Sequence, residues 1–287
     1  MYTTLIDAAQ LAASLNAPGW LIFDVRHDLA DHGAGRRAYE EAHIPGAHYL
    51  DHESQLAAPK TGSNGRHPLP GLPEFARLMH SHGLAPDTQV VIYDASAGMF
   101  AAHLWWMLRW LGHEKVAVLD GGWPAWLAQG GAVEAGSGSV TSAQAPTPKA
   151  QGSVHAAMAT VDADTVLANI HDKQFTVVDA RAANRYRGEV EPMDPVAGHI
   201  PGAINRPNTL NVQENGRFKP AQQLHDEFLA LLGDTPPSKV VHQCGSGITA
   251  CHNLLAMEVA GLGGSALYPG SWSEWCSDPS RPVARGD

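Results

Sequence analysis

An internal repeat constrains the fold of this chain of 287 residues more than any other feature. The pentapeptide HIPGA occurs twice, at residues 43–47 and 199–203. An Asp-x-Arg triplet precedes it each time, at the end of the apolar runs LIFD and TVVD. Each copy closes on a pair of tryptophans, namely Trp123 with Trp126 and Trp272 with Trp275. Because the order of these landmarks is preserved, the sequence predicts one structural unit present twice.

Within each copy, short β-branched runs alternate with stretches that are apolar at helical spacing. One such stretch presents Phe100, Leu104, Met107, Leu108 and Leu111. Strands separated by helices indicate a parallel sheet that is covered on both faces. The predicted fold class is therefore α/β, with two tandem domains, each a mainly parallel sheet flanked by helices.

Between the copies lies the segment GSGSVTSAQAPTPKAQGS. Its Gly, Ser, Thr and Pro residues cannot build a core and favour an extended connector. We predict a first domain over residues 1–135, a linker over residues 136–153 and a second domain over residues 154–287. The chain length agrees, since a domain usually takes roughly 100–200 residues.

The formal net charge of −10, with no local run of Lys or Arg, opposes the counterion-release attraction that drives nucleic-acid binding. No stretch approaches the roughly 20 apolar residues of a membrane span, and no basic segment precedes the apolar residues of the N-terminus. We expect no nucleic-acid partner, no membrane association and a cytoplasmic location.

The three cysteines are Cys244, Cys251 and Cys276, and none forms a CxxC pair. A disulfide framework or a thiolate zinc site is not expected, which leaves a reactive thiol or a buried apolar sulfur. Cys251 lies on the helix predicted after Cys244, where a buried role and a partner-thiol role both stay open. Cys276 has no sequence context that suggests chemistry.

Sixteen histidines raise the question of metal binding. His43, His48 and His52 are spaced by five and four residues. Pro45 and Gly46 interrupt any helix that would align their side chains. We therefore predict no metal site and no cofactor.

The segment VVHQCGSGITACHNLLAMEVAGLG predicts a strand, a tight glycine-containing loop and a helix. This order places Cys244 at the carboxyl end of a strand, where open α/β sheets bind ligands. Gly245 and Gly247 are expected to adopt positive φ angles. Thr249 is expected to cap a helix that begins at about Ala250.

In such a loop, backbone N–H groups converge on the cysteine sulfur. A helix N-terminus carries roughly half a positive charge, and thiols there have lowered pKa values. The sequence thus predicts that Cys244 is largely a thiolate and that the same cradle holds an anionic persulfide. The alternative is a small apolar residue that ends a strand. Polar Gln243, Ser246 and the loop glycines argue against burial among hydrocarbons.

The motif CGSGITA, the paired HIPGA segments, DAR and WSEW together resemble the tandem rhodanese-domain sulfurtransferases over nearly the whole chain. The resemblance implies two rhodanese-like α/β domains, with the catalytic cysteine in the second and the active site at their interface. The first copy has Asp94 where the second has Cys244, so its loop lacks a nucleophile. We interpret Asp94 as a loop or cap residue.

The Cys-Gly-Ser-Gly loop resembles that of 3-mercaptopyruvate sulfurtransferases, whereas thiosulfate-preferring members place basic residues after the cysteine. Thiosulfate leaves as doubly charged sulfite, which cationic side chains would stabilise. Mercaptopyruvate leaves as a pyruvate enolate, which needs a proton and a carboxylate anchor. Ser246 can relay that proton or simply stabilise the loop. The expected donor is 3-mercaptopyruvate, with thiosulfate:cyanide sulfurtransferase activity as the alternative.

Arg185 matches the family's substrate-binding arginine in the pattern Arg-aromatic-x-Gly/Ala, and its planar fork suits a carboxylate. Arg187 is a second candidate, more typical of a surface charge. The family carries a further arginine in a Glu-Pro-Arg context, where this chain has Met193. Either Arg187 compensates or the anchor is weaker. The predicted binding loop adds Gly245, Gly247, Ile248 and Thr249.

In the first copy, the resemblance places the loop PKTGSNGRHPLP at the domain interface, facing the cysteine of the second domain. His67 matches the family's interfacial histidine. Glu53 stands roughly where an aspartate partner is usual, and Asp51 is a rival. We predict a proton relay from Ser246 through His67 to one of these acids.

The mechanism that the resemblance implies has Cys244 attack the donor sulfur. A thiol acceptor such as reduced thioredoxin or a low-molecular-weight thiol, or cyanide in an assay, then collects the outer sulfur. A cysteine phosphatase is a distant alternative, because it would need an arginine where this loop has Ala250. A non-catalytic binding module would fit the first domain alone.

Overall fold

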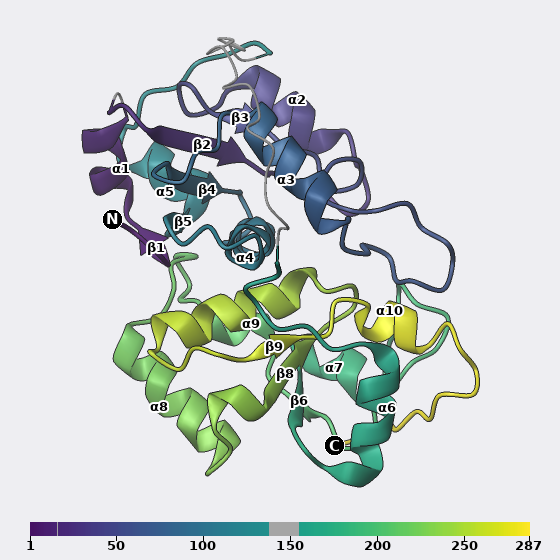
Figure 1. The fold of residues 1–287 in the computed structure, drawn as a ribbon. Helices are drawn as coiled ribbons and strands as arrows, with labels where there is room; N and C mark the ends of the chain where they lie inside the picture. The colour runs from purple at the N-terminus through teal and green to yellow at the C-terminus, as the bar shows by residue number, and fades with distance from the viewer. Residues whose placement is uncertain (16, 138–154) are drawn as a thin grey trace. The chain divides into compact units, whose positions relative to one another are not determined.

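The computed structural model describes residues 1–15, 17–137 and 155–287. Its contacts divide the chain into two compact units, both drawn in Figure 1. The first unit comprises Met1–Ala58, Pro70–Ala157 and Glu214–Arg217, and the second comprises Pro59–Leu69, Met158–Gln213 and Phe218–Asp287. Most of the predicted linker, residues 138–153, lies outside the described residues.

The first unit is built on a five-stranded sheet in the order β1-β5-β4-β2-β3, and every neighbouring pair is parallel. Its strands are β1 (Leu5–Ile6), β2 (Trp20–Asp24), β3 (His48–Tyr49), β4 (Gln89–Tyr93) and β5 (Val116–Leu119). Its helices are α1 (Ala8–Ser14), α2 (Ala34–Glu41), α3 (Leu72–Ser81), α4 (Ala101–Trp110) and α5 (Gly122–Ala128).

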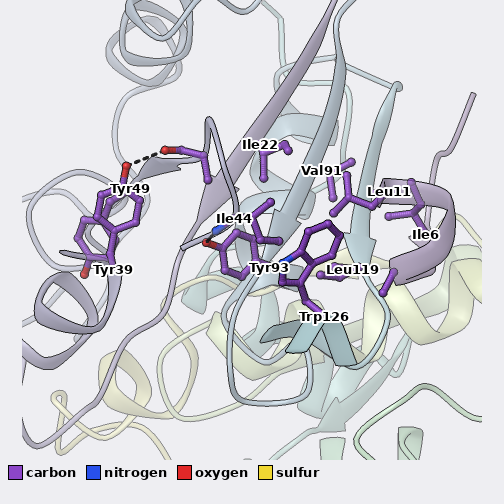
Figure 2. Close-up of a cluster of buried hydrophobic side chains, with 13 residues drawn as sticks. Ile6, Leu11, Ile22, Tyr39, Ile44, Tyr49, Val91, Tyr93, Leu119 and Trp126 are labelled. Carbon is purple, nitrogen blue, oxygen red and sulfur yellow. Dashed lines mark hydrogen bonds between the residues drawn. The ribbon is translucent and has the colours of Figure 1, made fainter. Parts of the chain in front are cut away.

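The core of this unit lies against the sheet. Figure 2 shows Ile22, Val91 and Leu119 of the central strands in one cluster with Leu11 of α1 and Trp126 of α5. The strands read as continuous β-branched runs because both faces of a parallel sheet are covered. Burial of such side chains contributes about 1.5–3 kcal/mol each.

The second unit repeats the plan with a four-stranded parallel sheet in the order β7-β6-β8-β9. Its strands are β6 (Thr176–Asp179), β7 (Ile204–Asn205), β8 (Val240–Gln243) and β9 (Ala266–Leu267). Its helices are α6 (Ala163–Asp172), α7 (Ala183–Tyr186), η1 (Asn208–Asn211), α8 (Ala221–Leu232), η2 (Pro237–Lys239), α9 (Ile248–Val259) and α10 (Ser271–Trp275). A parallel bridge from Thr160 to Leu267 occupies the edge where the first sheet has β1.

The repeated landmarks are buried contacts within each unit. Arg26 donates to the Asp24 carboxylate at 2.6 Å, and its guanidinium lies 4.6 Å from the ring centre of Trp123. The second unit forms the same contacts with Asp179, Arg181 and Trp272. The Asp-x-Arg triplet and the first tryptophan of each pair thus form the same ion-pair and cation–π contacts in each unit.

The HIPGA segment is also structural. The His43 ring stacks on Tyr39 at 3.9 Å, and the Tyr39 hydroxyl donates to the carbonyl of Ala47 at 2.6 Å. The second unit repeats this contact set with Tyr186, His199 and Ala203. Two parallel sheets flanked by helices confirm the predicted α/β class with two tandem domains. Among the described residues, every helix is too short or too polar to cross a bilayer.

Candidate active site

Cys244 directly follows β8, and its side chain is nearly buried, with 2% of the residue exposed. The backbone N–H of Gly247 donates to the sulfur at 3.2 Å. Gly247 has φ +89°, as predicted, and a Cβ there would lie 2.6 Å from the carbonyl oxygen of Pro269. Only glycine satisfies both constraints, so the position of this amide depends on Gly247.

The expected cap at Thr249 is wrong. Helix α9 begins at Ile248, earlier than the predicted start at Ala250, and its N-cap is Gly247. No side chain of the described residues makes the capping hydrogen bond. Gly247 takes the left-handed conformation at the N-cap and α9 starts at the next residue, so Thr249 already lies in the first turn.

Gly245 does not have the positive φ angle expected of it, and its small size serves another purpose. A Cβ at this position would lie 2.8 Å from Nη2 of Arg66 and 3.6 Å from both terminal nitrogens of Arg185. Gly245 therefore leaves room for two guanidinium groups beside the cysteine loop.

The polar side chain before the cysteine was expected to argue against burial, and this expectation is wrong. Gln243 is 0% exposed, and neither atom of its amide has a hydrogen-bond partner among the described residues. It ends β8, an inner strand of the second sheet, where both faces are covered. Cys244 thus lies at the buried end of β8, and its sulfur accepts the Gly247 N–H from the buried side of the loop.

Ser271 positions the cysteine backbone. The N–H of Cys244 donates to the Ser271 hydroxyl at 3.0 Å, and that hydroxyl donates to the carbonyl of Tyr268 at 2.9 Å. Ser271 has φ +55°, which is strained for a residue other than glycine. Sequence reasoning missed Ser271, although the first copy has Gly122 before its tryptophan and the second has this serine instead.

The structure brings two predicted catalytic residues together within the second unit. Nδ1 of His67 lies 2.8 Å from the Ser246 hydroxyl, and both side chains are buried. The two acids considered as third member belong to the first unit, where Glu53 lies 3.5 Å from His32 and Asp51 accepts hydrogen bonds from Ser54. The relay beyond His67 stays a prediction.

Two arginines meet carboxylates beside the cysteine loop. Nη2 of Arg185 donates to Glu191 at 2.6 Å and to Asp194 at 3.4 Å, and Arg66 is paired with the same Asp194. Burial alone would raise the pKa of Glu191, but the Arg185 hydrogen bond and charge hold it below its usual value. Nε of Arg66 is buried and has no hydrogen-bond partner among the described residues. Sequence reasoning missed Arg66, although it directly precedes His67.

Arg187 and Met193 lie in more exposed surroundings. Nε of Arg187 donates to Glu189 at 2.6 Å on the surface. Met193 is 40% exposed and brings no charge to the position of the family's further arginine. A substrate-binding role for Arg187 stays a prediction, as do the roles of Ile248 and Thr249.

The model of the rhodanese-like domain family matches residues 7–129 and 162–278, one match for each copy of the repeat. This chain belongs to the rhodanese-like family. A probable 3-mercaptopyruvate sulfurtransferase of Pseudomonas aeruginosa is 49% identical over 285 residues, covering 99% of this chain and 98% of the relative. A putative thiosulfate sulfurtransferase, SseB of Mycobacterium tuberculosis, is 38% identical over 291 residues, covering 98% and 97%.

Solved structures agree with this assignment. The crystal structure of SseA from Escherichia coli, described as a 3-mercaptopyruvate sulfotransferase with the rhodanese fold, superposes with a TM-score of 0.75 at 32% identity. The match covers 94% of this chain and 99% of SseA. The 3-mercaptopyruvate sulfurtransferase from Leishmania major gives a TM-score of 0.80 at 28% identity, over 98% of this chain and 75% of that one.

Cys244 is the most suitable nucleophile among the cysteines of this rhodanese-like chain. Burial raises the pKa of Cys251 well above its ordinary value, and its thiol donates to the carbonyl of Gly247 at 3.3 Å. Burial also raises the pKa of Cys276 to about 11. Both therefore stay protonated at neutral pH, which argues against a thiolate role for either.

The first rhodanese-like domain keeps the loop without the cysteine. The Asp94 carboxylate accepts backbone hydrogen bonds of 2.8–2.9 Å from Ser96, Gly98, Phe100 and Ala101. Ala97, three residues on, has a left-handed φ of +55°, as Gly247 does three residues after Cys244. Of the two readings of Asp94, as a loop or a cap residue, the structure supports the loop residue, because the N-cap of α4 is Phe100. The Asp94 carboxylate occupies the place in this loop where the backbone N–H groups converge.

Proposed function

We propose that this chain is a sulfurtransferase that takes sulfur from 3-mercaptopyruvate as a persulfide on Cys244. The observation that carries the proposal is the position of the Cys244 sulfur. It accepts a hydrogen bond from the Gly247 N–H, in a loop that lies beside the guanidinium groups of Arg66 and Arg185. The relatives named as 3-mercaptopyruvate sulfurtransferases support the same donor.

The Asp94 loop supports persulfide storage on Cys244. A carboxylate oxygen of Asp94 lies two bonds beyond Cβ, and the outer sulfur of a persulfide on Cys244 would lie equally far along its side chain. Four amides of the first loop donate to that anion. A loop with the same left-handed third residue is therefore suited to an anion at this place.

Arg185 and Arg66 are the residues that we propose to bind the donor carboxylate. Both guanidinium groups lie beside Gly245, and Nε of Arg66 is a buried donor with no acceptor among the described residues. Such a donor costs free energy until an acceptor reaches it. Arg66 would then supply the second cation that Met193 does not.

In the sulfur-loading step, the Cys244 thiolate attacks the donor sulfur. The new S–S bond forms as the C–S bond breaks, and the electron pair of that bond passes to the departing enolate. The proton lost by the donor thiol reaches the enolate carbon through Ser246 and His67, whose side chains lie 2.8 Å apart. Atoms and charge balance, and pyruvate leaves the persulfide behind.

In the second step, a thiolate acceptor attacks the outer sulfur and regenerates Cys244. We propose reduced thioredoxin or a low-molecular-weight thiol in this role, with cyanide as the assay acceptor, and a cytoplasmic location for the reaction. Two separate half-reactions give ping-pong kinetics.

The test compares kcat/KM for 3-mercaptopyruvate and thiosulfate with cyanide as acceptor. Intact-mass measurement after donor treatment should show the gain of one sulfur atom, and Cys244→Ser should lose both the gain and the turnover. A preference for thiosulfate would favour the alternative donor suggested by the name of the mycobacterial relative. Turnover in Cys244→Ser would overturn the mechanism.

A further inference from the structure

A second group of chemically active side chains lies in the first unit, at the carboxyl edge of its sheet. His27 and His32 lie in the loop that follows β2, and Glu53 lies in the loop that follows β3. Strands β2 and β3 pair in parallel, with Asp24 opposite Tyr49. Both loops therefore leave the same edge of the sheet, the edge where open α/β folds bind ligands.

The spacing of these side chains suits a shared cation. Nδ1 of His32 lies 3.5 Å from Oε1 of Glu53. One ring nitrogen of His27 completes a set of three atoms that all lie within 4.8 Å of one another. A tetrahedral zinc ion with bonds of about 2.0–2.2 Å separates its ligand atoms by about 3.4 Å. The first pair already has that separation, and a small movement of one ring would bring in the third ligand.

His27 gives independent support for a ligand. It is only 8% exposed, yet neither of its ring nitrogens has a hydrogen-bond partner among the described residues. Its ring packs against Phe100 at 5.1 Å and His52 at 5.6 Å. A buried imidazole without a partner is unfavourable, and a metal bond would satisfy one nitrogen.

The rhodanese-like fold does not require these residues. Ala182 follows the Asp-x-Arg triplet of the second copy, where the first copy has His27. Thr209 follows the second HIPGA at the distance where Glu53 follows the first. Both units fold around the same buried Asp-Arg-Trp cluster, so the two ligand residues serve something other than the repeated core.

We propose that His27, His32 and Glu53 bind one divalent cation of the zinc class. Two imidazole nitrogens and a carboxylate oxygen form the mixed set that such ions prefer, with a fourth position left for water. The cation would join the loop after β2 to the loop after β3 and so stabilise the first unit. This site differs from the histidine triplet that the sequence spacing suggested, because His43 instead stacks on Tyr39.

The experiment measures zinc binding by calorimetry on the chelator-treated full chain. It uses Cys244→Ser as the parent, so that the reactive thiol does not compete for the metal. His32→Ala is the principal variant, because 54% of the His32 side chain is exposed and its loss should leave the fold intact. His27→Phe is the second variant, and His171→Ala, an exposed histidine in the last turn of α6, is the matched control.

The expected result is one equivalent of zinc bound by the parent and by His171→Ala, with a higher Tm on binding. Zinc affinity should fall by at least about tenfold in His32→Ala and in His27→Phe. Each variant removes a proposed ligand, and loss of even a ligand's outer hydrogen-bond partner lowers metal affinity about 10-fold to 100-fold. Bound cobalt should show visible d–d bands without the charge-transfer band of a thiolate ligand. Absence of binding by the parent, or equal affinity in His32→Ala, would overturn the proposal.

Discussion

At the scale of single residues, part of the positive charge beside the cysteine loop comes from a side chain that the repeat does not mark. Arg66 lies directly before His67, and its Nη2 reaches the space left by the missing side chain of Gly245. Its pairing with Asp194 holds the guanidinium in place, while the Nε hydrogen has no acceptor in the part of the chain that the structure describes. The loop of the second unit thus has a preorganised cation next to Cys244, the proposed nucleophile.

Replacing Arg66 should weaken donor binding more than it changes the fold. One charge-assisted hydrogen bond contributes about 1.5–3 kcal/mol, so Arg66→Ala should lower kcat/KM for 3-mercaptopyruvate by roughly 10-fold to 100-fold. Most of the change should be in KM, because the anchor holds donor and transition state alike. Steady-state kinetics with cyanide as acceptor measure this.

Adding Met193→Arg to the Arg66→Ala variant should recover part of the loss, since it returns a cation to the Glu-Pro-x position. The rival hypothesis, in which Arg187 compensates for Met193, instead expects the loss in Arg187→Ala. Unchanged kinetics in Arg66→Ala would remove Arg66 from the proposed anchor.

Residue identities near the cysteine could be predicted only in part. Cys244, Ser246, His67 and Arg185 carry recognisable motifs, and the structure places Ser246 against His67. The role of Gly245 could not be predicted, because it depends on which distant side chain fills the space that the glycine leaves. A sequence pattern can indicate that a glycine needs a positive φ angle, but it does not show which side chains lie beside that glycine in space.

At the scale of elements, the loops before α4 and α9 share one backbone arrangement. Both follow an inner strand and place a left-handed residue third after the landmark position, Ala97 in one and Gly247 in the other. In the first loop the anion is part of the chain, as the Asp94 carboxylate. In the second, the anion comes and goes with the chemistry proposed for Cys244.

The Asp94 carboxylate should therefore be a strong stabiliser of the first unit. Asp94→Ala leaves four backbone N–H groups without their acceptor and should lower the free energy of unfolding by about 3 kcal/mol or more. Asp94→Asn keeps one acceptor oxygen, so its free energy of unfolding should lie between those of the parent and Asp94→Ala. Urea denaturation followed by circular dichroism measures the change.

The matched control is Asp87→Ala, whose carboxylate pairs with Lys115 while its side chain is 96% exposed. A surface ion pair of this kind is worth at most about 1 kcal/mol. Equal losses in Asp94→Ala and Asp87→Ala would show that the loop amides do not depend on the buried anion.

Element order could be predicted well, and element ends less well. The repeat and the β-branched runs were sufficient to predict two parallel sheets, because continuous β-branched runs between helices are typical of strands that are covered on both faces. The start of α9 was predicted too late, because a left-handed glycine can begin a helix without a capping side chain. A search for capping side chains therefore misplaces the start of a helix when backbone conformation alone sets it.

At the scale of the whole molecule, a buried histidine and a half-buried one link stability to pH. Burial lowers the pKa of His242 to about 3, and burial with the neighbouring His48 lowers the pKa of His82 to about 4. In the unfolded chain each titrates near its ordinary value of about 6.5. Below that value the unfolded state binds protons that the folded state does not, so stability falls as pH falls towards the folded pKa.

His242→Ile should reduce this dependence, because the corresponding residue of β4 is Ile92 and the repeat already accepts isoleucine there. Between about pH 6.5 and about pH 5, His242 should cost the native protein about 2 kcal/mol of stability. Urea midpoints of both proteins at about pH 7 and about pH 5 check this. Parallel declines in the two proteins would mean that His242 does not titrate on unfolding.

The Asp94 loop has a consequence for how the catalytic cycle can be studied. Since the first loop holds its negative charge on Asp94, it resembles the Cys244 loop as it would be with the proposed persulfide in place. Cys244→Asp would hold the second loop in an imitation of this short-lived form, with no donor present. We expect it to melt at a higher temperature than Cys244→Ser, and that difference would report how strongly this loop favours a negatively charged group at position 244.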